Sequence, residues 1–372
     1  MKSHLKNIVG FRTQRRIVVI ESDDWGSIRT RSKHDYEEML HKGLYLDNNS
    51  YTMFDSLESN SDLTSLFDVL SGIKDSNGRH PVFTPMYIMG NPDFVKIEES
   101  GFNQYHFEHF LETCKHYPNH DKVGELIKQG IDNKIFVPAL HGREHVNANR
   151  WLRLLKNGNT GMLIQFSHQS FGADNYKGEL IPMYLGTFDP QIVKDIEYIK
   201  SSLQDAVHMF KDTFGFAPEH FIEPNEYGPI EIEKILSDLG IKFLLRAKLT
   251  AYSNYHNTKT RKYFHWIGKK NKWNQIYLTR NCTFEPHTSF NTDWVGKTLK
   301  EIETSFFWKK PAVIISHRAS YIGSISAENQ MNGLTKLKTL LKSIVSRWPD
   351  VEFMTSMELG HLIEENKKNN LF

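Results

Sequence analysis

Cysteine and long apolar runs are both scarce in this chain. Its 372 residues include only two cysteines, Cys114 and Cys282, too few for a disulfide framework or a four-thiolate zinc site. The longest apolar runs, such as 17–20 and 312–315, are strand-sized, whereas a membrane-spanning helix needs about 18 apolar residues. No apolar stretch of signal-peptide length occurs in the N-terminal segment MKSHLKNIVGFRTQRR. We therefore expect a cytoplasmic protein without a transmembrane segment.

An excess of charge of one sign is also missing. The 46 basic and 44 acidic residues leave a formal net charge of +2. This near-balance gives no reason to expect nucleic acid as a partner. Hydrophobic residues make up 39% of the chain and aromatic residues 12%. That content is ample for a large buried core and excludes a disordered chain.

Short apolar runs alternate with segments of helical periodicity along most of the chain. Strands are predicted over 17–21, 82–88, 135–140, 220–223, 243–246, 275–279, 312–316 and 351–355. Helices are predicted over 61–73, 121–133, 190–213, 229–239, 292–306, 329–345 and 357–366. The near-continuous apolar character of the strands is typical of parallel strands covered on both faces.

This alternation predicts an α/β fold, a distorted parallel (β/α) barrel of seven to eight strands. The chain contains no internal repeat and no Pro- or Ser-rich linker, so we expect one domain over residues 1–372. Two stretches rich in Asn, Gly and His, near 89–120 and 146–188, interrupt the alternation. We expect them to form loop excursions over one face of the barrel, because loops of that length are usually functional.

Acidic and imidazole side chains follow three of the predicted strands. Asp23 and Asp24 follow the first strand, His141 and His145 follow the third, and His317 follows the seventh. The carboxyl ends of parallel barrel strands meet at one mouth, where the chemistry of such barrels occurs. These side chains are therefore expected to lie together.

The combination of one aspartate with two histidines indicates a metal site. Two adjacent carboxylates repel each other unless a cation is present, and a divalent ion bound to Asp24 removes that cost. His141 and His145 are four residues apart, a spacing that brings both imidazoles to one face of a helical turn. An Asp-His-His set suits zinc or a similar divalent ion and leaves a coordination position open for water. Asp23 then remains free to accept a proton, and His317 is a candidate general acid.

Five segments, in order, resemble the motifs of the polysaccharide deacetylase family, also called carbohydrate esterase family four or the NodB homology domain. They are IVVIESDDWG, HGREH, EPNEYG, VIISH and VEFMTSMEL, and the resemblance runs from Ile17 to about Ile363. It implies a distorted barrel of seven to eight strands, in agreement with the alternation. It further implies that Asp23 is the catalytic base, that Asp24, His141 and His145 bind the metal, and that His317 is the catalytic acid.

Three departures from the family pattern stand out. Gly142 occupies the place of the Ser or Thr that usually follows the first metal-binding histidine, and Arg318 replaces the Asp that follows the late histidine. The third motif, EPNEYG, lacks the arginine that orients the base in the family. Arg246, Arg280 and Arg318 lie at the ends of other predicted strands, and each is a candidate to supply that charge.

The expected reaction is metal-dependent removal of acetyl groups from a carbohydrate or glycan, with zinc as the most suitable ion. The departing group is an N-acetyl group or, by the same course, an O-acetyl group. We expect Trp25, Asn225 and Tyr227 to contact the substrate, since Trp25 adjoins the aspartate pair. Most other tryptophans, including Trp151, are expected in the core.

Three other interpretations remain open at the level of sequence. HGREH also fits the H-x-x-E-H pattern of metallopeptidases, with Glu144 as the base, but that pattern requires a helix and contains Gly142 here. Two histidines and a carboxylate also occur in non-haem iron oxygenases. A barrel that binds carbohydrate after losing catalysis is the third interpretation, motivated by the missing arginine.

Overall fold

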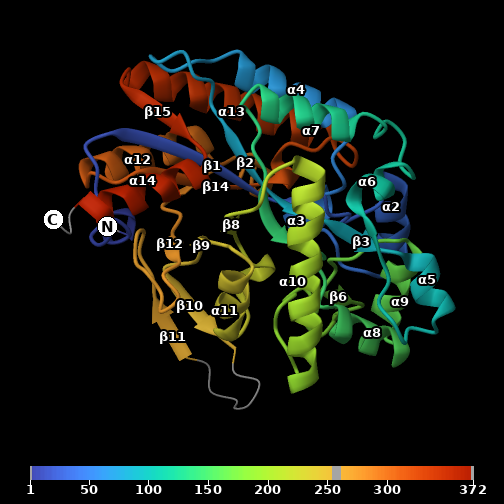
Figure 1. Ribbon diagram of the computed structural model, residues 1–372. Coiled ribbons are helices and arrows are strands. Elements are labelled where there is room, and N and C mark those ends of the chain that lie inside the picture. Colours follow the sequence, from blue (N-terminus) through green and yellow to red (C-terminus); the bar gives the residue numbers. More distant parts are fainter. Residues whose placement is uncertain (1, 254–260, 370–372) are drawn as a thin grey trace.

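A sheet of parallel strands, covered by helices, forms the centre of the computed structural model, which describes residues 2–253 and 261–369 (Figure 1). Its strands are β1 (Arg16–Trp25), β2 (Phe83–Ile88), β5 (Ala139–Gly142), β8 (His220–Phe221), β9 (Phe243–Leu245), β12 (Ile276–Leu278), β13 (Cys282–Thr283), β14 (Ala312–His317) and β15 (Val351–Met354). All pairings within this sheet are parallel. All eight predicted strands are present, although the first ends four residues later than predicted and the third begins four residues later, and β13 is an addition.

The order of the strands describes a barrel. The sheet runs β12-β9-β8-β5-β2-β1-β14-β13, and β15 also pairs with β1. Only residues 279–281 separate β12 from β13, so one extended segment, 276–283, pairs with β9 at its start and with β14 at its end. This segment joins the two ends of the sheet, which confirms the distorted parallel (β/α) barrel.

β1 is the central strand because three strands pair with it. β14 pairs along Val18 to Asp23, β15 pairs with the first half of β1 and β2 with the second half. The apolar run from Ile17 to Ile20 is fully buried, as expected for a parallel strand covered on both faces. The carboxyl end of β1 therefore lies in the middle of the barrel mouth.

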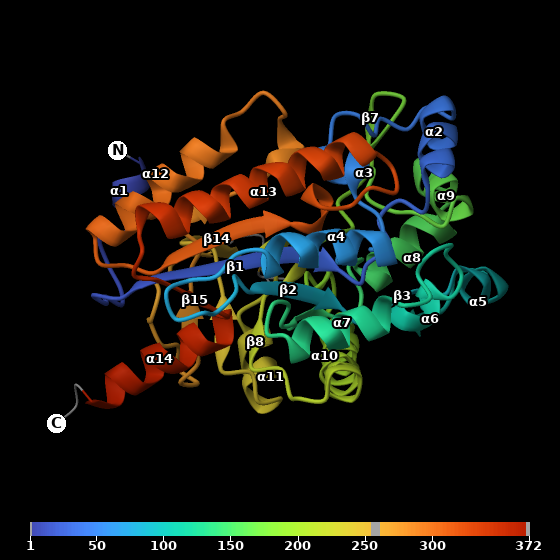
Figure 2. The same ribbon diagram turned by 90° about the horizontal axis from the view of Figure 1, so that it is seen from above.

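The predicted helices are all present and cover the sheet (Figures 1 and 2). They are α4 (Asn60–Ser71), α7 (Val123–Asp132), α10 (Val193–Phe214), α11 (Glu231–Asp238), α12 (Trp294–Phe307), α13 (Ala327–Arg347) and α14 (Ser356–Asn369). In α10, Ile199, Leu203 and Phe210 are buried on one face. The helix ends at Gly215, whose φ of 80° is the left-handed conformation that glycine adopts without strain.

The two predicted excursions contain short helices and hairpins instead of the expected loops. The first holds β3 (Gly90–Pro92), α5 (Phe94–Glu99), β4 (Phe107–His109) and α6 (Phe110–Cys114). The second holds α8 (Ala148–Lys156), α9 (Thr160–Ser167), β6 (Asn175–Tyr176) and β7 (Glu179–Leu180). The asparagines that suggested loops are in part helix caps, because Asn147 and Asn159 accept hydrogen bonds at the starts of α8 and α9. The excursions pack together through the ring of Phe94, which contacts Trp151 and Phe166.

The remaining elements are short. They are α1 (Lys2–Leu5), α2 (Lys33–His41), α3 (Ser50–Phe54), the hairpin of β10 (Leu249–Tyr252) and β11 (Arg261–Phe264), and the 3-10 helices Pro224–Glu226, Pro286–Thr288 and Arg318–Ser320. Within 2–253 and 261–369, no helix combines the length and the apolar character that crossing a membrane requires.

Candidate active site

A pocket of about 270 Å³ opens at the carboxyl ends of the strands. The residues that line it are Asp23, Asp24, Arg29, Tyr51, His141, His145, Ile222, Glu223, Asn225, Glu226, Arg280, Ile315 and His317. The structure thus brings the five residues predicted to carry the chemistry into one cavity, although they span nearly 300 positions of the sequence.

Both aspartates face this pocket because the backbone of Asp24 departs from strand geometry. Successive side chains of a regular strand point to opposite faces, so Asp23 and Asp24 would ordinarily diverge. Asp24 instead has a φ of 74°, and the register between β1 and β2 shifts between Ser22 and Trp25. Aspartate is one of the few non-glycine residues that adopts this left-handed conformation readily.

Asp24, His141 and His145 form a buried cluster whose ligand atoms all lie within 4.8 Å of one another. Oδ1 of Asp24 is 3.4 Å from Nε2 of His141 and 3.0 Å from Nε2 of His145. Two atoms bound to one ion at the usual distances and a tetrahedral angle lie roughly 3.4 Å apart. The separations and the donor types therefore fit one divalent ion. The imidazoles do not share a helical turn as the spacing suggested, because His141 lies in β5 and His145 in the loop after it.

A contact on the far side of His141 fixes the orientation of its ring, and a hydrogen bond holds the backbone of His145. Nδ1 of His141 lies 3.0 Å from the carbonyl oxygen of Ile222, which directs Nε2 toward Asp24. The carbonyl oxygen of His145 accepts a hydrogen bond of 2.8 Å from Thr187. Burial lowers the pKa of His145, which favours the neutral imidazole that metals bind. Gly142, between the two histidines, has a φ of 129°, which explains the departure from Ser or Thr at this position.

Arg280 supplies the charge beside Asp23 that the third motif lacks. Its Nη1 donates to Oδ2 of Asp23 at 2.7 Å, and its Nη2 donates to Oδ1 at 2.5 Å. Nε of Arg280 donates to Glu21 at 2.6 Å. Burial alone would raise the pKa of Asp23, but Arg280 outweighs it and lowers that pKa. Asp23 is therefore a carboxylate at neutral pH.

The two other candidate arginines bind carboxylates elsewhere. Arg246 pairs with Glu223 at 2.5 Å, in a fully buried contact. Arg318 pairs with Asp55 at 2.9 Å and with Glu58 at 2.8 Å. Glu58 also accepts a hydrogen bond from the backbone N–H of Gly26, so the Arg318 cluster connects the segments that follow Asp24 and His317.

His317 pairs with a carboxylate on its outer side. Its Nδ1 lies 2.6 Å from Oε1 of Glu285, and its Nε2 lies 3.6 Å from Oδ2 of Asp23. Burial disfavours the imidazolium, but the charges of Glu285 and Asp23 prevail and raise the pKa of His317 to about 9. The ring of Tyr51 meets that of His317 edge to face, with centroids 4.7 Å apart. At neutral pH, His317 therefore carries a proton that it can donate.

Of the three predicted substrate contacts, only Asn225 lines the pocket. The prediction for Trp25 is wrong, because its side chain is fully buried. Its Nε1 donates to Ser22, and its ring packs edge to face on Phe136. The shift of the backbone at Asp24 directs Trp25 into the core. Tyr227 is half-buried and lies outside the pocket lining.

Glu144 is buried behind the pocket, which removes the peptidase interpretation. It pairs with Arg143 at 2.5 Å and accepts hydrogen bonds from Tyr198 at 3.0 Å and Ser202 at 3.1 Å. It does not line the cavity that holds His141 and His145, and the HGREH segment is not helical.

Arg29, Tyr51 and Glu226 also line the pocket, and the sequence reasoning missed them as site residues. Arg29 follows β1 by four residues in an irregular region, Tyr51 lies further along the chain in α3, and no motif marks either of them. Glu226 lies within the third motif, one residue after Asn225, and its backbone φ of 44° is left-handed. Arg29 lies only a few residues beyond the end of β1, and this short distance is the signal that could have indicated it.

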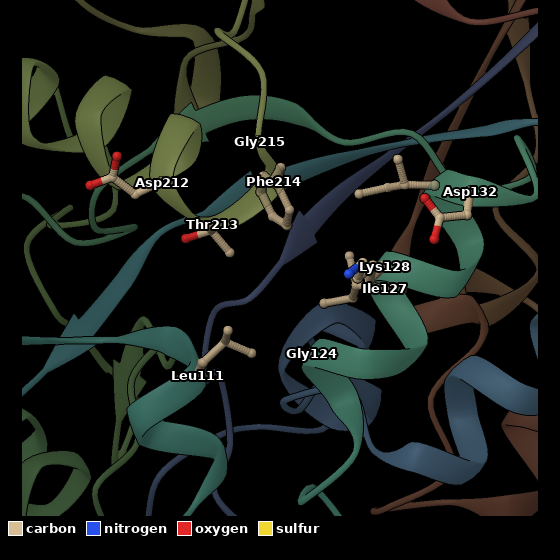
Figure 3. Close-up of a pocket in the computed structure, with 10 residues that line it drawn as sticks. Leu111, Gly124, Ile127, Lys128, Asp132, Asp212, Thr213, Phe214 and Gly215 are labelled. Atoms are coloured by element: carbon tan, nitrogen blue, oxygen red, sulfur yellow. The ribbon is translucent and has the colours of Figure 1, made fainter.

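A second cavity, of about 340 Å³, lies on the outside of the barrel between α7 and the end of α10 (Figure 3). Its lining includes Leu111, Ile127 and Phe214 together with Asp132 and Asp212. No histidine or cysteine is among the residues that line it, so it lacks the ligand set of the first pocket.

No family model matches this chain, and no curated protein matches it by sequence. Among solved structures, a putative polysaccharide deacetylase from Mycobacterium smegmatis matches with 10% identity over 96% of this chain and 94% of that one, at a TM-score of 0.45. A probable polysaccharide deacetylase from Pseudomonas aeruginosa matches with 9% identity, 94% and 91% coverage and a TM-score of 0.47. A 4-alpha-glucanotransferase from Thermococcus litoralis matches with 10% identity over 93% of this chain, at a TM-score of 0.44, and the chain spans 40% of its length.

Proposed function

We propose that this chain is a metal-dependent hydrolase that removes acetyl groups, N-acetyl or O-acetyl, from a carbohydrate or glycan. The observation that carries the proposal is the meeting of three parts in one pocket. These are the buried Asp24-His141-His145 cluster, the Asp23–Arg280 pair and the His317–Glu285 pair. A metal site flanked by one ionised carboxylate and one protonated imidazole is suited to metal-assisted hydrolysis.

Asp24, His141 and His145 would hold the ion, and zinc suits this donor set best. When bound, such an ion lowers the pKa of water toward neutrality and polarises a carbonyl oxygen. The chain supplies three ligands, which leaves room for the reacting groups. The lowered pKa of His145 matches the requirement that metal ligands be deprotonated.

Asp23 is the proposed general base. It is 5% exposed and lies beside the metal cluster in the sequence and in the pocket. It accepts the proton of the water whose oxygen attacks the acetyl carbon. The two hydrogen bonds from Arg280 leave a lone pair on each carboxylate oxygen. Arg280 is thus a positioning residue, since it holds the carboxylate in one orientation.

His317 is the proposed general acid. It donates its proton to the nitrogen or oxygen of the sugar as the bond to the acetyl carbon breaks, which yields acetate and the free amine or hydroxyl. Glu285 keeps the imidazole protonated, in one orientation, at neutral pH. The carboxylate of Asp23 is negatively charged and the imidazolium of His317 is positively charged. The pocket therefore holds one proton acceptor and one proton donor.

Metal analysis combined with an acetate-release assay tests this function. We expect purified protein to bind close to one zinc ion per chain and to release acetate from acetylated amino sugars, with and without oxygen. Asp23→Asn should retain the metal and lose turnover. Metal binding without acetate release from any acetylated glycan would instead favour the carbohydrate-binding barrel without catalysis. Turnover that requires oxygen would favour the oxygenase.

A further inference from the structure

Arg29 is a buried arginine in the pocket whose guanidinium forms no hydrogen bond or ion pair with the described residues, although the carboxylates of Asp24 and Asp55 act on it from a longer distance. Its residue is 7% exposed, and its side chain lines the same cavity as Asp24, Tyr51 and His145. Nε and Nη1 are both buried, and neither has a hydrogen-bond partner among the residues that the structure describes. No carboxylate in 2–253 or 261–369 lies within ion-pair distance of its guanidinium. A buried cation without a partner is costly.

The other arginines with equally buried residues are each paired at short distance. The partners are Glu144 for Arg143, Glu223 for Arg246, and Asp55 and Glu58 for Arg318, at 2.5 to 2.9 Å. Among the described arginines that are this buried, Arg29 is therefore the exception to the rule that buried charges are paired. An exception that faces a cavity indicates that the missing partner belongs to a ligand.

The protein holds Arg29 in place. Hydrogen bonds fix the backbone on both sides of it. The N–H of Ile28 donates to the side chain of Asn91, and the N–H of Thr30 donates to the carbonyl oxygen of Asp55. The carbonyl oxygen of Arg29 itself accepts from the N–H of Phe171. Gly172 packs on its side chain and has a φ of 121°. A Cβ atom at this glycine would lie 3.0 Å from Cδ of Arg29. The absence of a side chain at 172 therefore makes the room that the arginine occupies.

We propose that Arg29 binds a carboxylate of the substrate, so that the acetylated sugar is an acidic one. This inference rests on the proposed function and deepens it by naming the substrate class. Arg29 and Arg280 are the arginines of the lining, and Asp23 and Glu21 already neutralise Arg280. A single guanidinium without an ion-pair partner matches the single charge of a carboxylate better than the double charge of a phosphate dianion. The volume of about 270 Å³ suits a single sugar ring.

Equilibrium binding to zinc-loaded Asp23→Asn protein, which does not turn over, tests the inference. Three probes are compared by calorimetry: N-acetylglucosaminuronic acid, N-acetylglucosamine and N-acetylglucosamine 1-phosphate. We expect the uronic acid to bind about tenfold more tightly than the neutral sugar. Equal affinities for these two, or the tightest binding for the phosphate, would overturn the assignment.

Substitutions in the same background locate the effect. Arg29→Gln should remove the preference for the uronic acid, and Arg29→Lys should retain part of it. Arg31→Gln is the matched control, because Arg31 is exposed two residues further along the same segment and outside the pocket lining. A preference that survives Arg29→Gln in protein with an unchanged melting temperature contradicts the proposal.

The outcome is separable from that of the proposed function. Wild-type protein that releases acetate from neutral and acidic sugars at equal rates supports the deacetylase and overturns the carboxylate subsite. Protein that binds the uronic acid through Arg29 but releases no acetate supports the subsite and overturns the deacetylase.

Discussion

Asp23 and Arg280 are 257 positions apart in the chain, yet both carboxylate oxygens of Asp23 accept hydrogen bonds from the guanidinium of Arg280, at 2.7 and 2.5 Å. Asp23 lies near the end of β1, and Arg280 lies in the short connection between β12 and β13. These two side chains meet because the segment 276–283 completes the barrel.

Removing Arg280 should slow the reaction while leaving the metal bound. In Arg280→Gln the carboxylate of Asp23 keeps its charge but loses its orientation, and we expect kcat to fall roughly 10- to 100-fold, as for other groups that orient reacting residues. Arg280→Lys should recover little, because an ammonium group cannot form the two parallel hydrogen bonds. Steady-state kinetics with zinc analysis checks both. Arg347→Gln, at an exposed position of α13, should be without effect.

Metal binding should depend on the Asp24-His141-His145 cluster alone. Asp24→Asn and His141→Ala each remove one of three ligands. Each should lower the bound zinc from about one equivalent per chain to a small fraction of that. Asparagine is chosen at position 24 because it tolerates the positive φ there. Asp23→Asn and His208→Ala should keep the zinc, because His208 is an exposed residue of α10. Elemental analysis after dialysis gives the ratio. Full zinc in either ligand variant would refute the assignment.

The alkaline limit of activity should follow His317. Its pKa is raised to about 9, so the protonated acid is present at neutral pH, and kcat/KM should fall as the pH rises through about 9. The pair between His317 and Glu285 also stabilises the folded state. This contribution to the free energy of unfolding is complete below about pH 6.5 and is lost as the pH rises through about 9. Glu285→Gln should move the fall in kcat/KM toward pH 6.5. Glu303→Gln, at an exposed position of α12, should leave the profile in place.

The Arg318 cluster should contribute to stability far more than a surface pair. Arg318→Gln leaves Asp55 and Glu58 buried without their cation, and we expect a loss of about 3–5 kcal/mol in the free energy of unfolding. Arg16→Gln removes an exposed pair with Asp350 and should cost about 0–1 kcal/mol. Urea titration measures both. A small loss at Arg318 would mean that this cluster is not needed for the fold.

The sequence was sufficient for the elements and the class of fold. Runs such as Ile17–Ile20 and Ala312–Ile315 are apolar throughout because both faces of a barrel strand are covered, so their pattern is visible without a structure. The presence of β13 just beyond the sixth predicted strand was not predictable. Whether this segment forms a second strand depends on which neighbouring strand each half of 276–283 pairs with. That pairing is set by the curvature of the barrel and not by the residues of the segment itself.

The sequence indicated which residues meet where they directly follow a strand, and it gave no such indication where the backbone turns. Asp24, His141 and His145 could be grouped because strand ends converge. The burial of Trp25 could not be anticipated, since the prediction relied on its place beside the aspartate pair and the sequence does not reveal the left-handed φ of Asp24. Arg29 escaped notice because an isolated arginine in a loop ordinarily reaches solvent.

The segment 276–283 pairs with β9 at its start and with β14 at its end, so it is the seam at which the barrel closes. Arg280 lies in the middle of this seam, where the pairing partner changes. Loosening the seam would separate Arg280 from Asp23 without disturbing the pairing of β1 with β2 and β14. Such local opening requires less free energy than global unfolding. The contact between Asp23 and Arg280 would then open while the rest of the sheet stays paired, and it would form again once the seam recloses.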